Sequence, residues 1–524
     1  MTPFQAFSLW IRRAPTSQRA SAAAATALVL ALFVWLIVPS SGPSSSANAE
    51  STQAGGVTST TGAATSSSTT TSTSITTTAG VSSSGSDTSA GSATGGGGTT
   101  GGAKAPATSG SSSGATGARC VAPPGTDQGV SATQIKVAFD ITSIAGPTGN
   151  SAFGVPSPAQ QQADWQLVVN SVNASGGIAC RTLVPEYYTV NPADSSNLQS
   201  TCLDVVQAGV FAMVDTGAYL AFPSVAECYP QHQIPFFTGE DLPAAELQQF
   251  YPYLFAGGTY ETLYRNTVLG LNSRGFFSPA NGFQKLGFIY QDCLPSLVTE
   301  YNGLLQQIGV ASSQIVTYDV GCPGSFTSPS ILEAAIEKFK TAGVTNLTEV
   351  QELGDFDNFT TIAQAQGFDP KYGIPDEEFP EISGAGSMKP DAANLVGAVA
   401  IDNNRSAEET TPGFAPTAGT VKCNAILQAG GEPPVYQQSD GVPGIDCNLT
   451  WELVDAVDRA PALQRNALAD GLHATGSIDY SYPYGPNNFS GAGVTYGGEF
   501  WRPIGFSESC SCWQVLNPTF SPSF

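Results

Sequence analysis

The sequence predicts an α/β protein with two doubly wound parallel-sheet lobes, preceded by a disordered tether and one N-terminal apolar helix. From Gln134 onward, short apolar runs alternate with helical patterns, and the alternation restarts near Leu263. Residues 40–118 are almost entirely Ser, Thr, Gly and Ala, so they lack the large apolar side chains that a folded core needs. These observations predict one folded region, residues 119–524, behind a flexible linker.

The N-terminal residues predict export. Three arginines precede an apolar run at 22–38, and basic residues before such a run keep the N-terminus in the cytoplasm. We expect residues 1–21 to be a cytoplasmic n-region, 22–38 a transmembrane anchor or a signal-peptide h-region, and 39–118 a disordered linker. Both interpretations of 22–38 stay open: the protein is extracytoplasmic and either anchored to the membrane by this helix or secreted after cleavage.

The folded region is strongly acidic. The chain has 19 Lys and Arg against 42 Asp and Glu; four basic and two acidic residues lie in 1–118, which leaves a net charge of −25 for 119–524. A region this acidic does not attract nucleic acid or anionic lipid. The chain has only two histidines, which argues against histidine-based metal sites and catalysis. We expect no cofactor and no metal, and the composition leaves a soluble binding protein or a carboxylate-based enzyme.

Four apolar runs with helical patterns between them predict the first lobe. The continuous apolar run at 210–214 is typical of a buried parallel strand, and Ser175-Gly176-Gly177 ends the first helix. Strands are expected at 135–139, 183–188, 210–214 and 234–237, and helices around 165–172, 198–208 and 223–229.

The second lobe repeats the alternation. Strands are expected at 285–290, 314–318, 348–351 and 396–400, and helices at 263–273, 298–308 and 331–342. Ligands of open α/β sheets bind beyond the carboxyl ends of the strands. Two facing sheets would therefore pool these ends in one cleft.

Several segments resemble type I periplasmic binding proteins of the branched-chain amino-acid (Leu/Ile/Val) receptor kind. They are Gly129-Val-Ser-Ala-Thr-Gln-Ile-Lys-Val137, Val172-Asn-Ala-Ser-Gly-Gly-Ile178, Gly209-Val-Phe-Ala-Met-Val214 and Gln233-Ile-Pro-Phe-Phe237. The likeness covers about 125–400 and is looser to 524, where Gly498–Pro503 and Cys512-Trp513 resemble the closing strands. It implies a three-segment hinge, with crossings near 255–259, 394–400 and 480–500. Lobe one would comprise about 125–257 and 396–485, and lobe two about 258–395 and 486–524.

The resemblance also implies the function. It predicts a substrate-binding protein that captures a small molecule (an amino acid, an amide or a related small carboxylate) and presents it to ABC transporter permease subunits, with no enzymatic activity. Two alternatives remain: an extracellular sensor domain of the same fold without a transport role, and a secreted carboxylate-based hydrolase. Residues 119–524 contain no G-x-S-x-G, H-E-x-x-H or P-loop motif.

Ligand-binding positions are carried over from the resemblance by position. In lobe one they follow the first, third and fourth strands, and in lobe two they lie in the matching loops. They are Thr142, Ser143, Thr148, Thr216, Gly217, Ala218, Tyr219, Thr238, Gly239, Glu240, Asp241, Gln291, Asp292, Asp376 and Glu377. Amino-acid binders carry a Ser-rich loop after the third strand, whereas this chain has residues 215–220, Asp-Thr-Gly-Ala-Tyr-Leu, where Tyr219 would stack on a flat or apolar ligand. Alternatively, Tyr219 is a rim aromatic, and Thr216 and Thr238 only cap the following helices.

The ten cysteines all follow the apolar run, and an even number in an exported protein predicts disulfides. The implied fold favours the pairs Cys202–Cys228, Cys293–Cys322 and Cys423–Cys447. Four cysteines then remain, for which Cys120–Cys180 with Cys510–Cys512 is one combination.

Overall fold

The computed structural model describes most of the predicted folded region. It covers residues 122–144, 146–152, 155–217, 226–322, 327–350, 356–375, 392–437, 442–491, 493–498 and 500–524, which all belong to one compact unit, Gly110–Phe524. The segments predicted as n-region, apolar helix and linker lie outside these residues. Among the residues covered, no helix is both long and apolar enough to cross a membrane.

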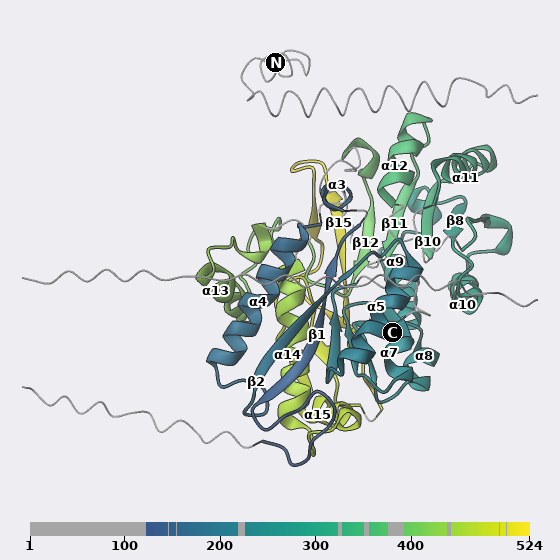
Figure 1. Ribbon diagram of the computed structural model, residues 1–524. Helices are drawn as coiled ribbons and strands as arrows, with labels where there is room; N and C mark the ends of the chain where they lie inside the picture. Colours follow the sequence, from purple (N-terminus) through teal and green to yellow (C-terminus); the bar gives the residue numbers. More distant parts are fainter. Residues whose placement is uncertain are drawn as a thin grey trace, which may run out of the picture. The chain divides into compact units, whose positions relative to one another are not determined.

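The first sheet has five parallel strands in the order β2-β1-β3-β4-β6 (Figure 1). This order places β1 inside the sheet, and the chain winds outward from it in both directions, as in other doubly wound sheets. The strands are β1 (Gln134–Thr142), β2 (Thr182–Val190), β3 (Ala212–Asp215), β4 (Phe236–Thr238) and β6 (Leu254–Phe255).

Helices cover both faces of this sheet. Side chains alternate between the faces along each strand, so Phe139 of β1 packs with Trp165 at 4.7 Å between ring centroids, whereas Ala138 joins the core on the opposite face. On the Phe139 side lie α4 (Pro158–Ala174), α14 (Val442–Arg459) and α15 (Leu468–Thr475); on the other lie α5 (Ser195–Ala208), α7 (Cys228–Gln231) and α8 (Ala244–Gln249). Two short helices complete this part, α3 (Pro147–Ala152) and α13 (Ala418–Ala429), the second in contact with α4 and α14.

The second sheet is parallel at one end and antiparallel at the other. Its order is β16-β15-β12-β11-β10-β8-β9, with β17 also on β15. The parallel strands are β8 (Leu286–Tyr290), β9 (Ile315–Asp319), β10 (Asn346–Val350), β11 (Lys371–Pro375) and β12 (Val399–Asp402); the antiparallel ones are β15 (Phe500–Ser507), β16 (Cys512–Val515) and β17 (Ser521–Pro522). Residues of α9 (Tyr260–Ser273) and α10 (Pro295–Gln307) share one core with this sheet, and those of α11 (Pro329–Ala342) and α12 (Phe356–Ala365) share another.

Three stretches of chain connect the two sheets. The first runs from β6 through β7 (Gly258–Thr259) into α9, and β7 pairs with β5 (Asp241–Leu242). The third contains β13 (Ser477–Ile478) and β14 (Asn487–Asn488), which pair with each other, and ends in β15. The second crossing was predicted near 394–400, but β12 pairs with β11 and β15 of the second sheet. The chain therefore leaves that sheet only after Asp402; the apolar residues at 396–400 gave no indication of which sheet they would join.

The three disulfides predicted with the fold are confirmed. They are Cys202–Cys228, Cys293–Cys322 and Cys423–Cys447, with Cα–Cα distances of 6.4, 4.9 and 6.0 Å, which lie within the usual range. Cys510 pairs with Cys512, as in the combination considered above. Cys180 is also disulfide-bonded; its expected partner, Cys120, lies outside the described residues.

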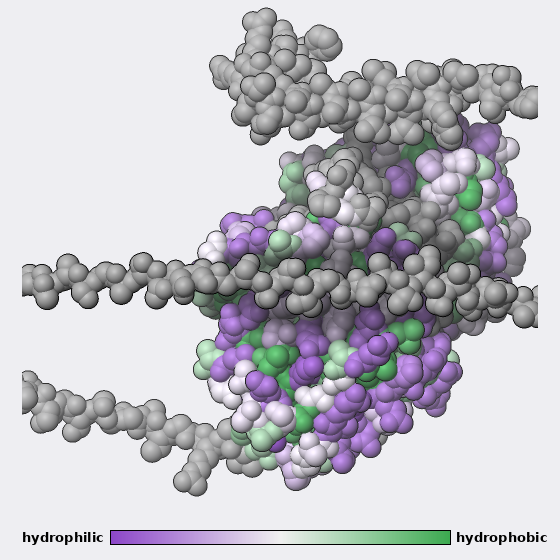
Figure 2. Space-filling model, viewed as in Figure 1, coloured by the Kyte–Doolittle hydropathy of each residue, from purple (hydrophilic) through white to green (hydrophobic). Residues whose placement is uncertain are grey.

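The surface is polar with scattered apolar residues. Figure 2 shows hydrophilic and hydrophobic residues interspersed on the visible face. The large hydrophobic side chains that are exposed in the described part lie at separate places along the chain: Leu203, Tyr251, Val396, Val421, Leu516 and Phe524. Single exposed apolar residues of this kind are normal for soluble proteins.

Candidate functional site

Buried carboxylates mark the carboxyl ends of the first sheet. Asp140, near the end of β1, is fully buried. Thr216 donates to it twice, from its backbone N–H at 2.9 Å and from its hydroxyl at 3.0 Å, and Thr142 donates a longer hydroxyl bond of 3.3 Å. Burial raises the pKa of Asp140 to about 6, although these hydrogen bonds act to lower it.

Asp215, the last residue of β3, repeats the arrangement. The Thr238 hydroxyl donates to its Oδ2 at 3.0 Å, and the Gly217 N–H lies 3.2 Å from the same oxygen. Thr142, Thr216 and Thr238 were predicted to bind ligand through their hydroxyls. Each of these O–H groups instead donates to a protein carboxylate, so in this arrangement it is not directed at a ligand carboxylate.

Next to these strand ends is a cavity of about 40 Å³. It is lined by the loop after β4 and by all three connections between the sheets: Gly239, Glu240, Asp241, Gly257, Tyr260, Asn403, Asn404, Tyr484, Gly485, Asn487 and Gly498. A cavity needs roughly 10–15 Å³ of this volume to hold one water molecule, so it has room for about three. Each of the three crossings therefore contributes residues to this cavity.

Glycines form much of the cavity wall because no larger residue fits there. A Cβ added to Gly239 would lie 1.9 Å from the Tyr484 hydroxyl oxygen, and one added to Gly485 would lie 1.9 Å from the Asn403 carbonyl oxygen. A Cβ on Gly258, beside the cavity, would lie 2.4 Å from Oδ1 of Asp241. The three connections thus approach one another at backbone distance.

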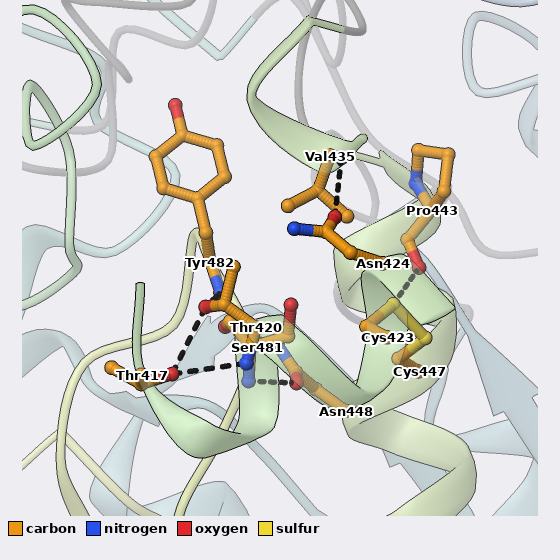
Figure 3. The surroundings of a disulfide bond; sticks show 10 residues. All are labelled: Thr417, Thr420, Cys423, Asn424, Val435, Pro443, Cys447, Asn448, Ser481 and Tyr482. Atoms are coloured by element: carbon orange, nitrogen blue, oxygen red, sulfur yellow. Dashed lines mark hydrogen bonds between the residues drawn. A yellow bond between two sulfur atoms is a disulfide. The ribbon is translucent and has the colours of Figure 1, made fainter. Parts of the chain in front are cut away.

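The chain just before Tyr484 is held from the α13–α14 side, through the contacts of Ser481 and Tyr482 drawn in Figure 3. Asn448 of α14 exchanges two hydrogen bonds with the backbone of Ser481, at 2.9 and 2.7 Å, and Thr420 of α13 accepts from the Tyr482 N–H at 3.0 Å. The Cys423–Cys447 disulfide joins these two helices. The Tyr484 N–H then closes a turn onto the Ser481 carbonyl at 3.0 Å, which fixes where the tyrosine enters the cavity wall.

Two side chains of the cavity have strongly raised pKa values. Burial, with a smaller contribution from Glu261, raises the pKa of Asp241 to about 7. Tyr484 is 6% exposed, and burial together with the charges of Glu240, Glu452, Asp241 and Asp215 raises its pKa well above the usual value. Tyr484 therefore keeps its proton at any physiological pH.

The predicted site residues fall into four groups. Gly239, Glu240 and Asp241 line the cavity, whereas Thr142, Ser143, Thr216, Gly217 and Thr238 lie at the neighbouring strand ends of the first sheet. Gln291 and Asp292 follow β8 of the second sheet, where the Gln291 N–H donates to the Val350 carbonyl and the Asp292 N–H donates to the Gly321 carbonyl. Ala218, Tyr219, Asp376 and Glu377 lie outside the described residues, as does the side chain of Thr148. Contact of any of them with a ligand stays a prediction.

Sequence reasoning missed Tyr260, Asn403 and Tyr484 as cavity residues. Tyr260 directly follows the predicted first crossing, and Tyr484 lies inside the predicted third one. The crossings were therefore the available signal, although nothing local distinguishes these side chains. Within the described part, no cluster of three or more His, Cys, Asp or Glu side chains is arranged to hold a metal ion.

The fold is shared with solved structures at low sequence identity. A possible leucine/isoleucine/valine-binding protein from Rhodopirellula baltica SH 1 matches with a TM-score of 0.54 and 15% identity, over 74% of this chain and 97% of the other. A solute-binding protein from R. palustris in complex with 4-hydroxybenzoate matches with a TM-score of 0.54 and 10% identity, over 74% and 97%. A fatty acid ABC transporter substrate-binding protein from Thermomonospora curvata matches with a TM-score of 0.52 and 15% identity, over 76% and 95%.

The chain has the type I periplasmic-binding-protein fold. No family model matches the sequence, and no curated protein matches it either. The resemblance drawn from short segments is thus confirmed at the level of the fold.

Proposed function

We propose that this protein is an extracytoplasmic solute-binding protein that captures a small molecule between its two lobes and delivers it to an ABC permease. The observation that carries the proposal is the position of the cavity. It lies at the carboxyl ends of the first sheet, where α/β sheets bind ligands, and all three connections between the sheets line it.

The matched structures support this proposal. One of them is described with 4-hydroxybenzoate and another as a fatty acid transporter component, so this fold accommodates different solutes. Binding without catalysis suits the described residues, because the threonine hydroxyls at the strand ends are occupied by buried carboxylates. The strand pairing supports a division into two lobes, with the second crossing after Asp402.

Ligand-dependent melting of the full-length protein tests the proposal. The panel should contain amines, amino acids, amides and carboxylates. A solute at 100 times its Kd adds about 2.7 kcal/mol of stability and raises the melting temperature by a few degrees. The same solute should reduce the radius of gyration in small-angle scattering as the lobes close.

A conservative pair of variants locates the binding region. Glu240→Gln neutralises a carboxylate that lines the cavity, whereas Glu333→Gln neutralises an exposed carboxylate in α11. Loss of the melting shift in the first variant alone supports binding at the cavity. A panel in which no solute changes either melting or compactness would argue against a solute-binding role.

A further inference from the structure

The turn between β15 and β16 contains a disulfide whose two cysteines are separated by a single residue. It joins Cys510 to Cys512, with Ser511 between them. Cys510 and Ser511 are exposed and Cys512 is half-buried, so a reagent in the solvent has access to this disulfide. β16 lies at the edge of the second sheet, and no residue of this turn lines the cavity between the crossings.

The backbone inside this small ring is unfavourable. Ser511 has a φ of 51°, a left-handed conformation that side chains other than Gly, Asn and Asp adopt at a cost in energy. Opening the disulfide frees Ser511 to leave this conformation. A ring closed over two residues also removes less entropy from the unfolded chain than rings closed over 24, 26 or 29 residues. The Cys510–Cys512 disulfide therefore stabilises the fold least of these four.

The hairpin has other contacts that hold its two strands together. Phe506 and Trp513 meet across it at 5.7 Å between ring centroids, and Trp513 is buried. The Val515 N–H donates to the Thr411 hydroxyl at 2.8 Å, and β15 also pairs with β12 and β17. Reduction of the disulfide should therefore loosen the turn and leave the sheet in place.

Three other disulfides have the features of structural links. Cys202–Cys228 joins α5 to α7 and Cys423–Cys447 joins α13 to α14, and these four cysteines are at most 6% exposed. Cys293–Cys322 is more accessible, but it connects the loops after the neighbouring strands β8 and β9 across 29 residues. Exposed or strained disulfides are the ones that thiols reduce most easily. Cys510–Cys512 combines exposure, a short span and an unfavourable backbone.

We propose that Cys510–Cys512 is a thiol–disulfide exchange site, which reacts with low-molecular-weight monothiols and carries the resulting mixed disulfide on Cys510. The inference goes beyond the proposed function and does not depend on solute capture.

The exchange has two steps. The thiolate of a monothiol attacks Sγ of Cys510, the S–S bond breaks, and Cys512 leaves as a thiolate that takes up the proton released by the monothiol. A second monothiol then attacks the sulfur of the adduct, and Cys510 leaves and is protonated in the same way. Two thiols are thus oxidised to one disulfide, while Cys510 and Cys512 are reduced to thiols. When no second thiol arrives, Cys512 attacks Cys510 and expels the first one.

Redox titration of the full-length protein tests the proposal. The protein is equilibrated with mixtures of reduced and oxidised glutathione at neutral pH, free thiols are trapped by alkylation, and peptide mass spectrometry assigns each cysteine. We expect half-reduction of Cys510–Cys512 in a mixture at least about tenfold less reducing than the other disulfides require, with a glutathione adduct on Cys510. Reduction of Cys293–Cys322 in the same mixture, an adduct mainly on Cys512, or no reduction before the protein unfolds would overturn the proposal.

Substitutions at Ser511 test the contribution of its backbone. Asn adopts the left-handed conformation more readily than Ser, and Val adopts it less readily. Half-reduction should therefore need a severalfold more reducing glutathione mixture in Ser511→Asn and a severalfold less reducing one in Ser511→Val. The same two changes at Ser509, an exposed serine of the same turn outside the ring, should have no effect. Equal effects at both positions would overturn the role of the Ser511 backbone.

A double variant separates exchange from folding. Cys510→Ser with Cys512→Ser should melt within a few degrees of the wild type and form no glutathione adduct. Cys423→Ser with Cys447→Ser is the matched control, and it should melt well below the wild type because it removes a buried link. A turn variant that melts as low as the control would overturn the proposal, since the disulfide would then be structural. Exchange at the turn in a protein that binds no solute would support the proposal and count against the proposed function.

Discussion

Two groups of carboxylates lie near the end of β12. One contains an arginine, and the other has no basic residue in its lining. In the second sheet, Arg502 is fully buried and lies 2.8 Å from Glu408 and 3.7 Å from Asp402. Its guanidinium also donates to the Ser406 carbonyl at 3.1 Å and lies 4.4 Å from the centre of the Phe520 ring. One residue further along, Asn403 enters the cavity of Asp241, where no arginine or lysine is among the lining residues.

The contrast is one of charge compensation. The Arg502 cluster contains its own cation, which lies beside both carboxylates. At the cavity, burial raises the pKa of Asp241 to about 7, which reflects a carboxylate without a compensating charge. The carboxylates beside Arg502 are thus compensated by a cation, whereas the carboxylates of the cavity have no basic side chain among the lining residues.

Removing the positive charge of Arg502 should have the largest effect on stability. Arg502→Met removes the cation beside buried Asp402 and leaves Glu408 its ion pair with Arg405 at 3.3 Å, and breaking a buried pair costs about 3–5 kcal/mol. Urea denaturation measures the loss. Arg265→Met is the control, because its ion pair with Glu300 is partly exposed and is worth about 0–1 kcal/mol. Equal losses in the two variants would contradict the structural role of the cluster.

Filling the glycine wall should have the next largest effect. In Gly239→Ala, the new Cβ would meet the Tyr484 hydroxyl, and overpacking of this kind costs about 1–3 kcal/mol. Gly303→Ala in α10 should instead stabilise by about 0.5–1 kcal/mol, since nothing lies within 4 Å of the added Cβ. The cost of Gly239→Ala should fall when it is combined with Tyr484→Phe; a cost that does not change would place the strain elsewhere.

Removing the charge of Asp241 should stabilise the protein, whereas removing the charge of Arg502 should destabilise it. Because the pKa of Asp241 is about 7 when folded and 3.8 as an isolated group, the folded state binds a proton more tightly between these values. Its contribution therefore becomes unfavourable as pH rises from 4 to 7, and remains so above pH 7. Asp241→Asn should stabilise the protein by about 1–2 kcal/mol at pH 8, allowing for its partial exposure, and by little at pH 4. A variant that is less stable at pH 8 would contradict this account.

Periodicity predicted the sheets well and the C-terminal helices poorly. The strand at 210–214 is a continuous apolar run, and the structure forms β3 within it. The helices α13, α14 and α15 were not predicted individually, and β11 was not among the predicted strands. Residues such as Tyr372 and Ile374 become buried only because β10 and β12 lie on either side of them.

Of the candidate site, the sequence predicted the strand ends but not their chemistry. Thr216 and Thr238 were expected to direct their hydroxyls at a ligand. Instead, the Thr216 hydroxyl donates to Asp140 and the Thr238 hydroxyl donates to Asp215. The residue types allow both roles. Only the distances between strands that are remote in the sequence decide which acceptor each hydroxyl reaches.

The sequence by itself determined the α/β alternation and the acidic character of the folded region, because these follow from local periodicity and composition. Three disulfide pairs followed from the fold that the resemblance to type I periplasmic binding proteins implied. The tertiary structure alone decided which sheet takes β12 and which carboxylate receives a cation. It also brought Asp241, Asn403 and Tyr484 to one cavity. These outcomes depend on contacts across about 160 and 80 residues of chain, where hydrogen-bond partners and burial are set by packing and leave no local pattern in the sequence.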